Sequence, residues 1–295
     1  MIVATFTVTA IVLVAFIIIA ITIAIIYRHA PSKRTPPPIY AIMITGKDAC
    51  RVEFARASVS NFQEQDYGGE KRLIIINHGR ERVTDTDMTA IDTTLNIFEF
   101  HVAKDKHSLA LGDLRNIALE LVPIDALWTV WDDDDYRSPQ YMSTLQKHMH
   151  KTRADAVVFT SRTEYNHNTG LVWKMKLKSG FVTVLAKQDK RIKYQSKDSM
   201  EDSDLVSTLR RLKKVATLDT DSTLDSAYDF YIRTVHTGNT SLYVDQAKQN
   251  TNNSSRTNIN YIESEIDPGQ QVIIRDFMYG YFKRAFQCID ESVKT

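Results

Sequence analysis

The sequence has little cysteine and no excess of either charge. Its 295 residues include only two cysteines, Cys50 and Cys288, which provide no disulfide framework and are compatible with a reducing compartment. The formal net charge is +1, so no basic excess indicates a nucleic-acid partner. No internal repeat is visible. A hydrophobic content of 43% is enough for a sizeable core, which leaves a globular domain as the expectation.

Charged side chains are also missing from residues 2–26, where Ile, Val, Ala, Leu and Phe predominate. A membrane-spanning helix needs about 20 apolar residues. This run is longer than a typical signal-peptide core, and no basic residue precedes it. Residues 1–27 are therefore predicted to form an uncleaved, single-pass transmembrane anchor. Residues 28–38, which are basic and proline-rich, are predicted to be a stiff spacer, and residues 39–295 to form one domain.

Two opposed signals bear on the orientation of this anchor. Arg28, Lys33 and Arg34 follow the span directly, which by the positive-inside rule favours a cytosolic domain. Glycosylation sequons, which are usable only in a lumen, point the other way and occur at Asn239, Asn252 and Asn253. We expect a single-pass membrane protein with its domain on the cytosolic side, and the Golgi or ER lumen is the alternative.

Four consecutive aspartates, residues 132–135, follow an apolar run at residues 126–131. This pattern predicts a buried strand that carries carboxylates to its C-terminal end, the edge at which open α/β sheets bind ligands. Two like charges about 4 Å apart cost roughly 4 kcal/mol near a protein surface, so the cluster calls for a cation. Carboxylate oxygens suit Mg²⁺ or Mn²⁺. Ser138 and Pro139 are predicted to cap and begin the next helix, and a solvated acidic loop is the alternative interpretation.

Apolar runs and helical periodicity alternate along the first half of the domain. Strands are predicted at residues 40–45, 71–77, 96–102, 126–131 and 154–160, and helices at residues 51–65, 112–121 and 139–151. This order predicts an α/β fold with a doubly wound, mostly parallel sheet and helices on both faces. Later elements are predicted as paired strands at residues 171–177 and 181–185, a helix at 201–212, a strand at 229–235 and a closing helix at 269–292.

Five segments resemble, in the same order, motifs of one enzyme family. They are the strand-turn-helix of residues 42–65, the Gly-Asp-Leu-Arg-Asn-Ile-Ala-Leu run at 112–119, the aspartate strand with its proline at 131–139, Met-Glu-Asp-Ser-Asp-Leu at 200–205, and the strand ending in His-Thr-Gly-Asn-Thr-Ser at 231–241. Together they resemble the family-2 inverting glycosyltransferases, which have the nucleotide-diphospho-sugar transferase fold called GT-A. The resemblance covers about residues 40–241.

Two positions depart from the pattern of that family. After the second strand the family usually has Asp-Asp-Gly-Ser, whose aspartate contacts the nucleotide base, whereas this chain has Asn77-His78-Gly79-Arg80. An asparagine still donates and accepts at a base edge, so base binding is compatible with the change while the choice of donor stays open. The first turn is Thr45-Gly46-Lys47-Asp48 in place of the usual Pro-Thr-Tyr-Asn.

The resemblance implies transfer of a sugar from a UDP- or GDP-sugar to a glycan, lipid or protein acceptor, with Mn²⁺ or Mg²⁺ at the leaving diphosphate. It implies metal ligands at Asp134, Asp132 and His236. It implies nucleotide-sugar contacts at Thr45, Gly46, Asn77, Arg115, Asp132 and Asp133. Asp202 is the implied general base, and Glu201 would bind the acceptor or share that role.

Each of these assignments has a structural alternative. Glu201 and Asp202 also suit an ordinary acidic helix start, Arg115 a surface position, and His236 a structural role. Asp135 is interpreted as a helix-start residue favoured by the helix dipole. At the level of the whole domain, a catalytically inactive module that binds nucleotide-sugars or glycans is the main alternative. A nucleotidyltransferase is disfavoured because residues 45–48 make a poor phosphate loop.

Overall fold

The computed structural model describes residues 35–46, 50–84, 96–102, 109–198, 201–220, 230–236 and 261–292. The chain divides into two units, Met1–Pro36 and Pro37–Thr295, and the second is described below. The predicted anchor at residues 1–27 and the three sequons lie outside the described residues. Within the described ranges, no helix is both long and apolar enough to span a membrane.

One mixed sheet organises the domain, and ten strands belong to it in the described part of the chain. Its order is β3-β2-β1-β4-β7-β6-β9-β5, with β10 paired to β7 and β8 paired to β6. The strands are β1 (Ile39–Thr45), β2 (Lys71–Asn77), β3 (Ile97–His101), β4 (Leu127–Val130), β5 (Tyr136–Arg137), β6 (Ala156–Asn166), β7 (Val172–Lys187), β8 (Val215–Leu218), β9 (Tyr231–Val235) and β10 (Tyr261–Glu265).

The first four strands are parallel neighbours, as the sequence predicts. β1 pairs with β2 on one side and with β4 on the other, and β3 extends the sheet beyond β2. Leu73, Ile74, Ile75 and Ile76 are fully buried, because a parallel strand covered on both faces needs a continuous apolar run. The carboxyl ends of these strands therefore meet at one edge of the sheet.

Beyond β4 the sheet becomes antiparallel in part. β7 pairs antiparallel with both β4 and β6, so β6 does not lie beside β4. The prediction of two strands with a turn at residues 179–180 is wrong, because β7 is one continuous strand, Val172–Lys187. The register of its pairing with β6 shifts around Phe159, and such an irregularity lets a long strand bend.

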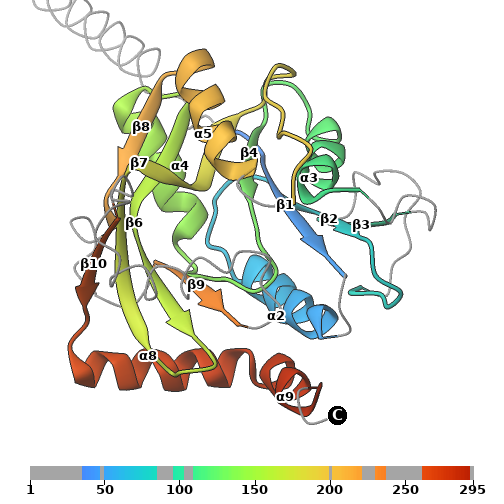
Figure 1. Ribbon diagram of the computed structural model, residues 1–295. Helices are drawn as coiled ribbons and strands as arrows, with labels where there is room; N and C mark the ends of the chain where they lie inside the picture. Colours follow the sequence, from blue (N-terminus) through green and yellow to red (C-terminus); the bar gives the residue numbers. More distant parts are fainter. Residues whose placement is uncertain are drawn as a thin grey trace, which may run out of the picture. The chain divides into compact units, whose positions relative to one another are not determined.

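Helices cover both faces of the sheet, which confirms that prediction (Figure 1). The described helices are α2 (Arg51–Gln63), α3 (Leu111–Glu120), α4 (Tyr141–Thr152), α5 (Glu201–Leu212), α8 (Pro268–Tyr281) and α9 (Lys283–Ser292). Side chains alternate along a strand, so Ala41 and Met43 pack with α2 and α4. Tyr40 and Ile42 face the opposite side and pack with α3 and α5.

The predicted start of the fourth helix is wrong. α4 begins at Tyr141 with Gln140 at its N-cap, three residues after the predicted cap at Ser138. Residues 136 and 137 form β5 in between, antiparallel to β9. Because this strand separates the aspartates from α4, Asp135 is not a helix-start residue.

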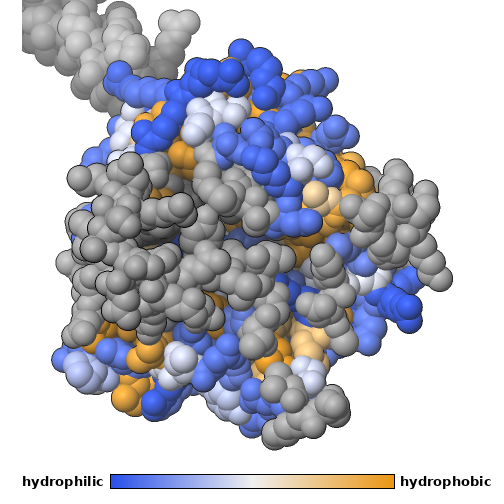
Figure 2. Space-filling model, viewed as in Figure 1, coloured by the Kyte–Doolittle hydropathy of each residue, from blue (hydrophilic) through white to orange (hydrophobic). Residues whose placement is uncertain are grey.

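The closing helix is divided at Phe282 into α8 and α9. Asp267 caps α8 by accepting from the amides of Gly269 and Gln270. Apolar residues of the two helices that face the domain form a third core with Phe54 and Tyr165. The exposed face of α8 is also apolar in part, through Val272, Ile273, Phe277 and Tyr279. Figure 2 shows apolar patches along the edge of the domain where Figure 1 draws this helix.

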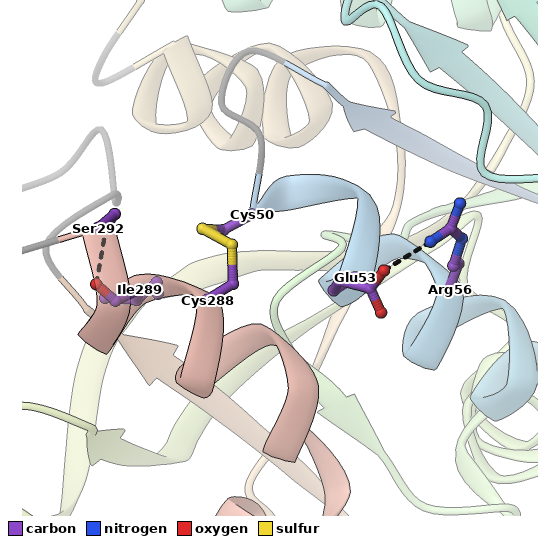
Figure 3. Close-up of a disulfide and its surroundings, with 6 residues drawn as sticks. All are labelled: Cys50, Glu53, Arg56, Cys288, Ile289 and Ser292. Carbon is purple, nitrogen blue, oxygen red and sulfur yellow. Dashed lines mark hydrogen bonds and ion pairs between the residues drawn. A yellow bond between two sulfur atoms is a disulfide. The ribbon is translucent and has the colours of Figure 1, made fainter.

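A disulfide joins Cys50, directly before α2, to Cys288 in α9 (Figure 3). The expectation that these two cysteines provide no disulfide is therefore wrong. Their Cα atoms lie 5.6 Å apart although 238 positions separate them in the sequence. A local sequence pattern cannot predict this pairing, because only the packing of the C-terminal helices against α2 brings the two cysteines together.

Candidate active site

The aspartate cluster lies at the carboxyl edge of the parallel strands. β4 carries the chain into residue 132, and the amide of Trp131 still donates to the carbonyl of Ile42 in β1 at 2.9 Å. At the same edge β1 ends at Thr45, which is in register with Asn77 at the end of β2. The parallel register thus places three predicted site segments side by side.

Asp133 and Asp134 share one guanidinium. Nη1 of Arg51, the first residue of α2, lies 2.6 Å from Oδ1 of Asp133 and 2.7 Å from Oδ2 of Asp134. The hydroxyl of Thr45 donates to the other oxygen of Asp133 at 2.7 Å. Both carboxylates are buried. The sequence indicated that these charges need a cation, and Arg51 supplies one from within the chain.

The two carboxyl groups have different proton affinities. Burial raises the pKa of Asp133 to about 7, with Arg51 opposing the rise and Asp134 adding to it. Burial acts on Asp134 in the same direction, but Arg51 and His236 outweigh it and hold the pKa of that carboxyl well below its usual range. The pKa values of two neighbouring carboxyl groups move apart in this way because a negative charge on one group makes ionisation of the other less favourable. Asp134 is therefore the member of the pair that stays anionic.

His236 directly follows β9 and reaches the same carboxylate. Its Nε2 lies 3.2 Å from Oδ2 of Asp134, and its ring stacks on Phe54 of α2 with 4.8 Å between the centroids. Two neighbouring ligands on an octahedral Mg²⁺ or Mn²⁺ ion, each about 2.1 Å from the metal, lie roughly 3.0 Å apart. The two atoms fit one ion on that criterion, although no metal-like cluster of three His, Cys, Asp or Glu residues occurs among the described residues.

Asp132 is the most accessible of the four aspartates, with a side chain that is 39% exposed. Nη2 of Arg115, from the first half of α3, donates to its Oδ1 at 3.0 Å. The guanidinium of Arg115 also lies over the ring of Tyr194, 5.2 Å from its centroid. Arg115 is buried, so it is no surface residue and instead fixes the direction of Asp132.

Asp135 is a buried hub that the sequence did not reveal. Its carboxylate accepts from the hydroxyl of Tyr231 and, at 3.0 Å, from the amide of Thr234, both in β9. Burial and the neighbouring Asp134 raise its pKa to about 7. These bonds join the aspartate turn to the strand that delivers His236. The only sequence signal is the fourth aspartate itself, and it gives no indication of its partners.

Arg137 is a second residue that the sequence analysis missed. It is fully buried, and its guanidinium lies over the ring of Trp131, 4.4 Å from the centroid. Nη1 donates to the carbonyls of Asp132 and Asp135 at 3.2 and 3.3 Å. Asn61 of α2 holds the backbone of Arg137 by hydrogen bonds in both directions. The buried guanidinium of Arg137 thus fixes the backbone of the aspartate turn from the protein interior.

The turns after β1 and β2 are in direct contact. Gly46 has a φ of +99°, and a Cβ placed there would lie 2.2 Å from Oδ1 of Asn77 and 2.4 Å from the amide nitrogen of Gly79. The side chain of Asn77 is fully buried. It accepts from the Gly79 amide and donates to Glu99 and to the carbonyl of Glu81. Asn77 therefore shapes this turn through partners inside the protein.

Glu99 of β3 anchors that arrangement and is another residue the sequence analysis missed. It is buried and accepts from Asn77, from the amides of Val83 and Thr84 and from the Thr84 hydroxyl. Burial alone would raise the pKa of Glu99, but these hydrogen bonds outweigh it and the pKa lies below its ordinary value. The segment after β2 is thereby held to the sheet.

Glu201 and Asp202 begin α5, and the structure does not describe their side chains. The chain before α5 is joined to the start of α3, because the Gly112 amide donates to the Lys197 carbonyl at 3.1 Å. Lys197 also reaches Asp204, in the first turn of α5, at 2.9 Å. The start of α5 is thus tied to the helix that carries Arg115.

Comparisons with known proteins add little to this geometry. No protein-family model matches the chain, and no curated protein matches it. Its structure is similar to that of Staphylococcus aureus TarS residues 1–349, with 13% identity and a TM-score of 0.45 over 67% of this chain and 60% of that one. The TarS complexes with UDP and with UDP-GlcNAc give 15% and 14% identity and TM-scores of 0.46 and 0.47, again over 60% of that chain. A likeness of this size carries no argument about the activity of this chain.

Proposed function

We propose that this chain is a glycosyltransferase of the GT-A type, which moves a sugar from a nucleotide-sugar to an acceptor hydroxyl with inversion. The observation that supports it most is the pairing of Asp134 with His236 at the carboxyl edge of the parallel strands, directly after the more accessible Asp132. That edge is where open α/β sheets bind nucleotides. The five ordered sequence motifs agree with this placement.

On the donor side, Asp134 and His236 would hold Mn²⁺ or Mg²⁺, with Asp132 as a further ligand. When bound there, the ion would supply positive charge to the departing diphosphate. Asp133 has both oxygens engaged by Thr45 and Arg51, so it positions its neighbours. Gly46 and Asn77 shape the turns that would receive the nucleotide, and Arg115 directs Asp132 toward it.

On the acceptor side, Asp202 would accept the proton of the attacking hydroxyl, and Glu201 would bind the acceptor or share this role. The placement of the start of α5 beside α3 supports this assignment. The acceptor is a glycan, a lipid or a protein, and the donor is a UDP- or GDP-sugar.

Residues 1–27 would anchor the enzyme in a membrane. The Cys50–Cys288 disulfide favours an oxidising compartment, and with it a lumenal or external domain instead of the cytosolic one expected from the basic residues. Use of the sequons is the measurement that decides this. A mass decrease on treatment of the cell-expressed chain with an endoglycosidase supports the lumenal orientation. Full-length chain that carries no glycan and has both thiols free in intact cells contradicts it.

The experiment that tests the proposed activity is a ligand screen on the purified full chain. UDP- and GDP-sugars are tested with and without Mn²⁺ for thermal stabilisation and for slow hydrolysis. A ligand that binds the native state at 100 times its Kd stabilises it by about 2.7 kcal/mol, so no acceptor has to be known. We expect one class of donor to give a metal-dependent response and hydrolysis, and Asp134→Asn to lose both.

The other outcomes separate the alternatives. A nucleotide-sugar that stabilises the chain without any turnover, even with Mn²⁺ and in the presence of candidate acceptors, would favour an inactive binding module. No response across the whole panel contradicts the proposed function. Asp276→Asn serves as the matched control, because Asp276 is an exposed aspartate of α8 and its loss should leave the response unchanged.

A further inference from the structure

The C-terminal helices α8 and α9 hold α2 through several contacts. Phe54 packs against Phe282 and Phe286, with ring centroids 5.1 and 5.5 Å away. One turn later the hydroxyl of Tyr281 donates to the carbonyl of Ala57 at 2.8 Å. The disulfide from Cys288 to Cys50 adds a covalent link at the very start of the helix (Figure 3). α2 is therefore fixed from the C-terminal helices at three successive points.

The first turn of α2 carries the side chains that contact Asp134 directly or through a neighbour. Arg51 donates to Oδ2 of Asp134. Phe54 stacks on His236, whose Nε2 faces the same oxygen. A displacement of this one turn would thus move the guanidinium away from the carboxylate that is proposed to serve the donor, and it would remove the ring on which the imidazole of His236 stacks.

Cys50 occupies the N-cap position of the same turn. Its side chain makes no capping hydrogen bond, because its sulfur is bonded to Cys288. A hydrogen bond from the N-cap side chain normally helps to hold the first turn of a helix. At this residue the covalent bond supplies a restraint instead, and it does so next to Arg51.

We propose that the Cys50–Cys288 disulfide is a positioning device for donor binding, which holds Arg51 and His236 on Asp134. This inference rests on the proposed function. Reduction by a dithiol breaks the sulfur–sulfur bond, gives each cysteine a proton and an electron, and converts the dithiol to its own disulfide. The loss of the link frees the first turn of α2 and weakens nucleotide-sugar binding, while the sheet stays folded.

A double-mutant cycle separates this role from general stabilisation. The dissociation constant of the nucleotide-sugar is measured for the full chain, for Cys50→Ala/Cys288→Ala, for Arg51→Met, and for the triple variant. Because the disulfide acts in part through Arg51, we expect the double-cysteine variant to bind about tenfold more weakly and the triple variant to bind less weakly than the sum of the two separate effects predicts. Reduction of the wild-type chain should reproduce the double-cysteine result, and reoxidation should reverse it.

Two results would overturn the proposal. In one, the effects of the cysteine and Arg51 substitutions add fully. In the other, Met149→Ala, a buried substitution in α4 that lowers the melting temperature by a similar amount, weakens donor binding as much as loss of the disulfide. Binding is measured well below the melting temperature of every variant, so that unfolded chain does not contribute.

A readout without ligand keeps the proposal testable if the proposed function fails. Hydrogen exchange is followed at the amides of residues 54–58, whose helical acceptors are the carbonyls of residues 50–54. Reduction should speed their exchange and leave the amides of β1 and β2 protected. If no nucleotide-sugar binds but this exchange responds, the proposed function is wrong and the coupling between disulfide and α2 stands. If the exchange does not respond, the positioning role is wrong.

Discussion

Arg51 and Asp134 form a charge-assisted hydrogen bond of 2.7 Å between Nη1 and Oδ2. The same nitrogen lies 2.6 Å from Oδ1 of Asp133, so one guanidinium balances two buried carboxylates. The chain thus carries a cation of its own at the aspartate cluster.

Substitution of Arg51 by methionine should destabilise the fold strongly. Two carboxylates would remain buried without their cation, and removal of one partner from a buried ion pair costs about 3–5 kcal/mol. The measurement is urea unfolding at neutral pH. Arg56→Met is the control, since Arg56 is exposed and its ion pair with Glu53 lies at the protein surface, where such pairs contribute about 0–1 kcal/mol. Equal stability of the two variants would contradict the role given to Arg51.

Gly46→Ala should damage the turn between β1 and α2. The residue has a positive φ, and the new Cβ would collide with Asn77 and with the backbone of Gly79. A non-glycine residue in such a conformation costs about 1–3 kcal/mol, and the clash adds to it. Gly68→Ala is the matched control, because a Cβ at Gly68 meets nothing within 4 Å. Thermal unfolding of both variants is the measurement, and a tolerated Gly46→Ala would contradict the observed turn.

Tyr231→Phe should lower the free energy of unfolding by about 1–3 kcal/mol, because it removes a hydroxyl that donates to a buried carboxylate. That carboxylate is Asp135, which Tyr231 ties to β9. Tyr281→Phe removes a hydroxyl that donates to a neutral backbone carbonyl and should cost less, about 0.5–1.5 kcal/mol. Denaturant unfolding compares the two variants. The comparison is made at about pH 8, above the raised pKa of Asp135, and a smaller loss for Tyr231→Phe than for Tyr281→Phe would argue against Asp135 as a buried hub.

The buried Glu164 should give part of the stability a defined pH dependence. Burial alone would raise the pKa of Glu164, but Arg162 and Arg233 outweigh it and lower the pKa below its ordinary value. A group with a depressed folded pKa stabilises the fold above its unfolded pKa, about 4.3 for glutamate, and loses this effect as the pH falls through the folded pKa. The stability difference between wild type and Glu164→Gln should therefore be full above about pH 5 and shrink below about pH 4.

Unfolding curves of the two proteins from pH 3 to pH 7 test this expectation. All other carboxylates titrate in both proteins, so their contributions cancel in the stability difference between wild type and variant. A difference that grows toward acid pH would have the wrong sign and would contradict the ion-pair account of Glu164, Arg162 and Arg233.

Local pattern was enough to predict much of the fold. The apolar runs at residues 71–77 and 126–131 correspond to β2 and β4, and the periodic segments at residues 51–65, 112–121 and 201–212 correspond to α2, α3 and α5. Alternation of strand and helix correctly indicated a sheet with helices on both faces. The prediction failed at the long strand β7, because Ser179 and Gly180 suggest a turn locally, whereas the chain stays in one strand that pairs with β6 before and after these two residues.

The sequence by itself determined that an aspartate cluster would end a buried strand, since hydrophobic runs and charge repulsion are local properties. Only the tertiary structure decided which groups surround each carboxylate. Arg51 and His236 reach Asp134, Tyr231 reaches Asp135, and Cys50 meets Cys288. These partners are distant in sequence, and no residue type specifies a particular partner until the register of the sheet and the packing of α2 bring the two atoms within bonding distance.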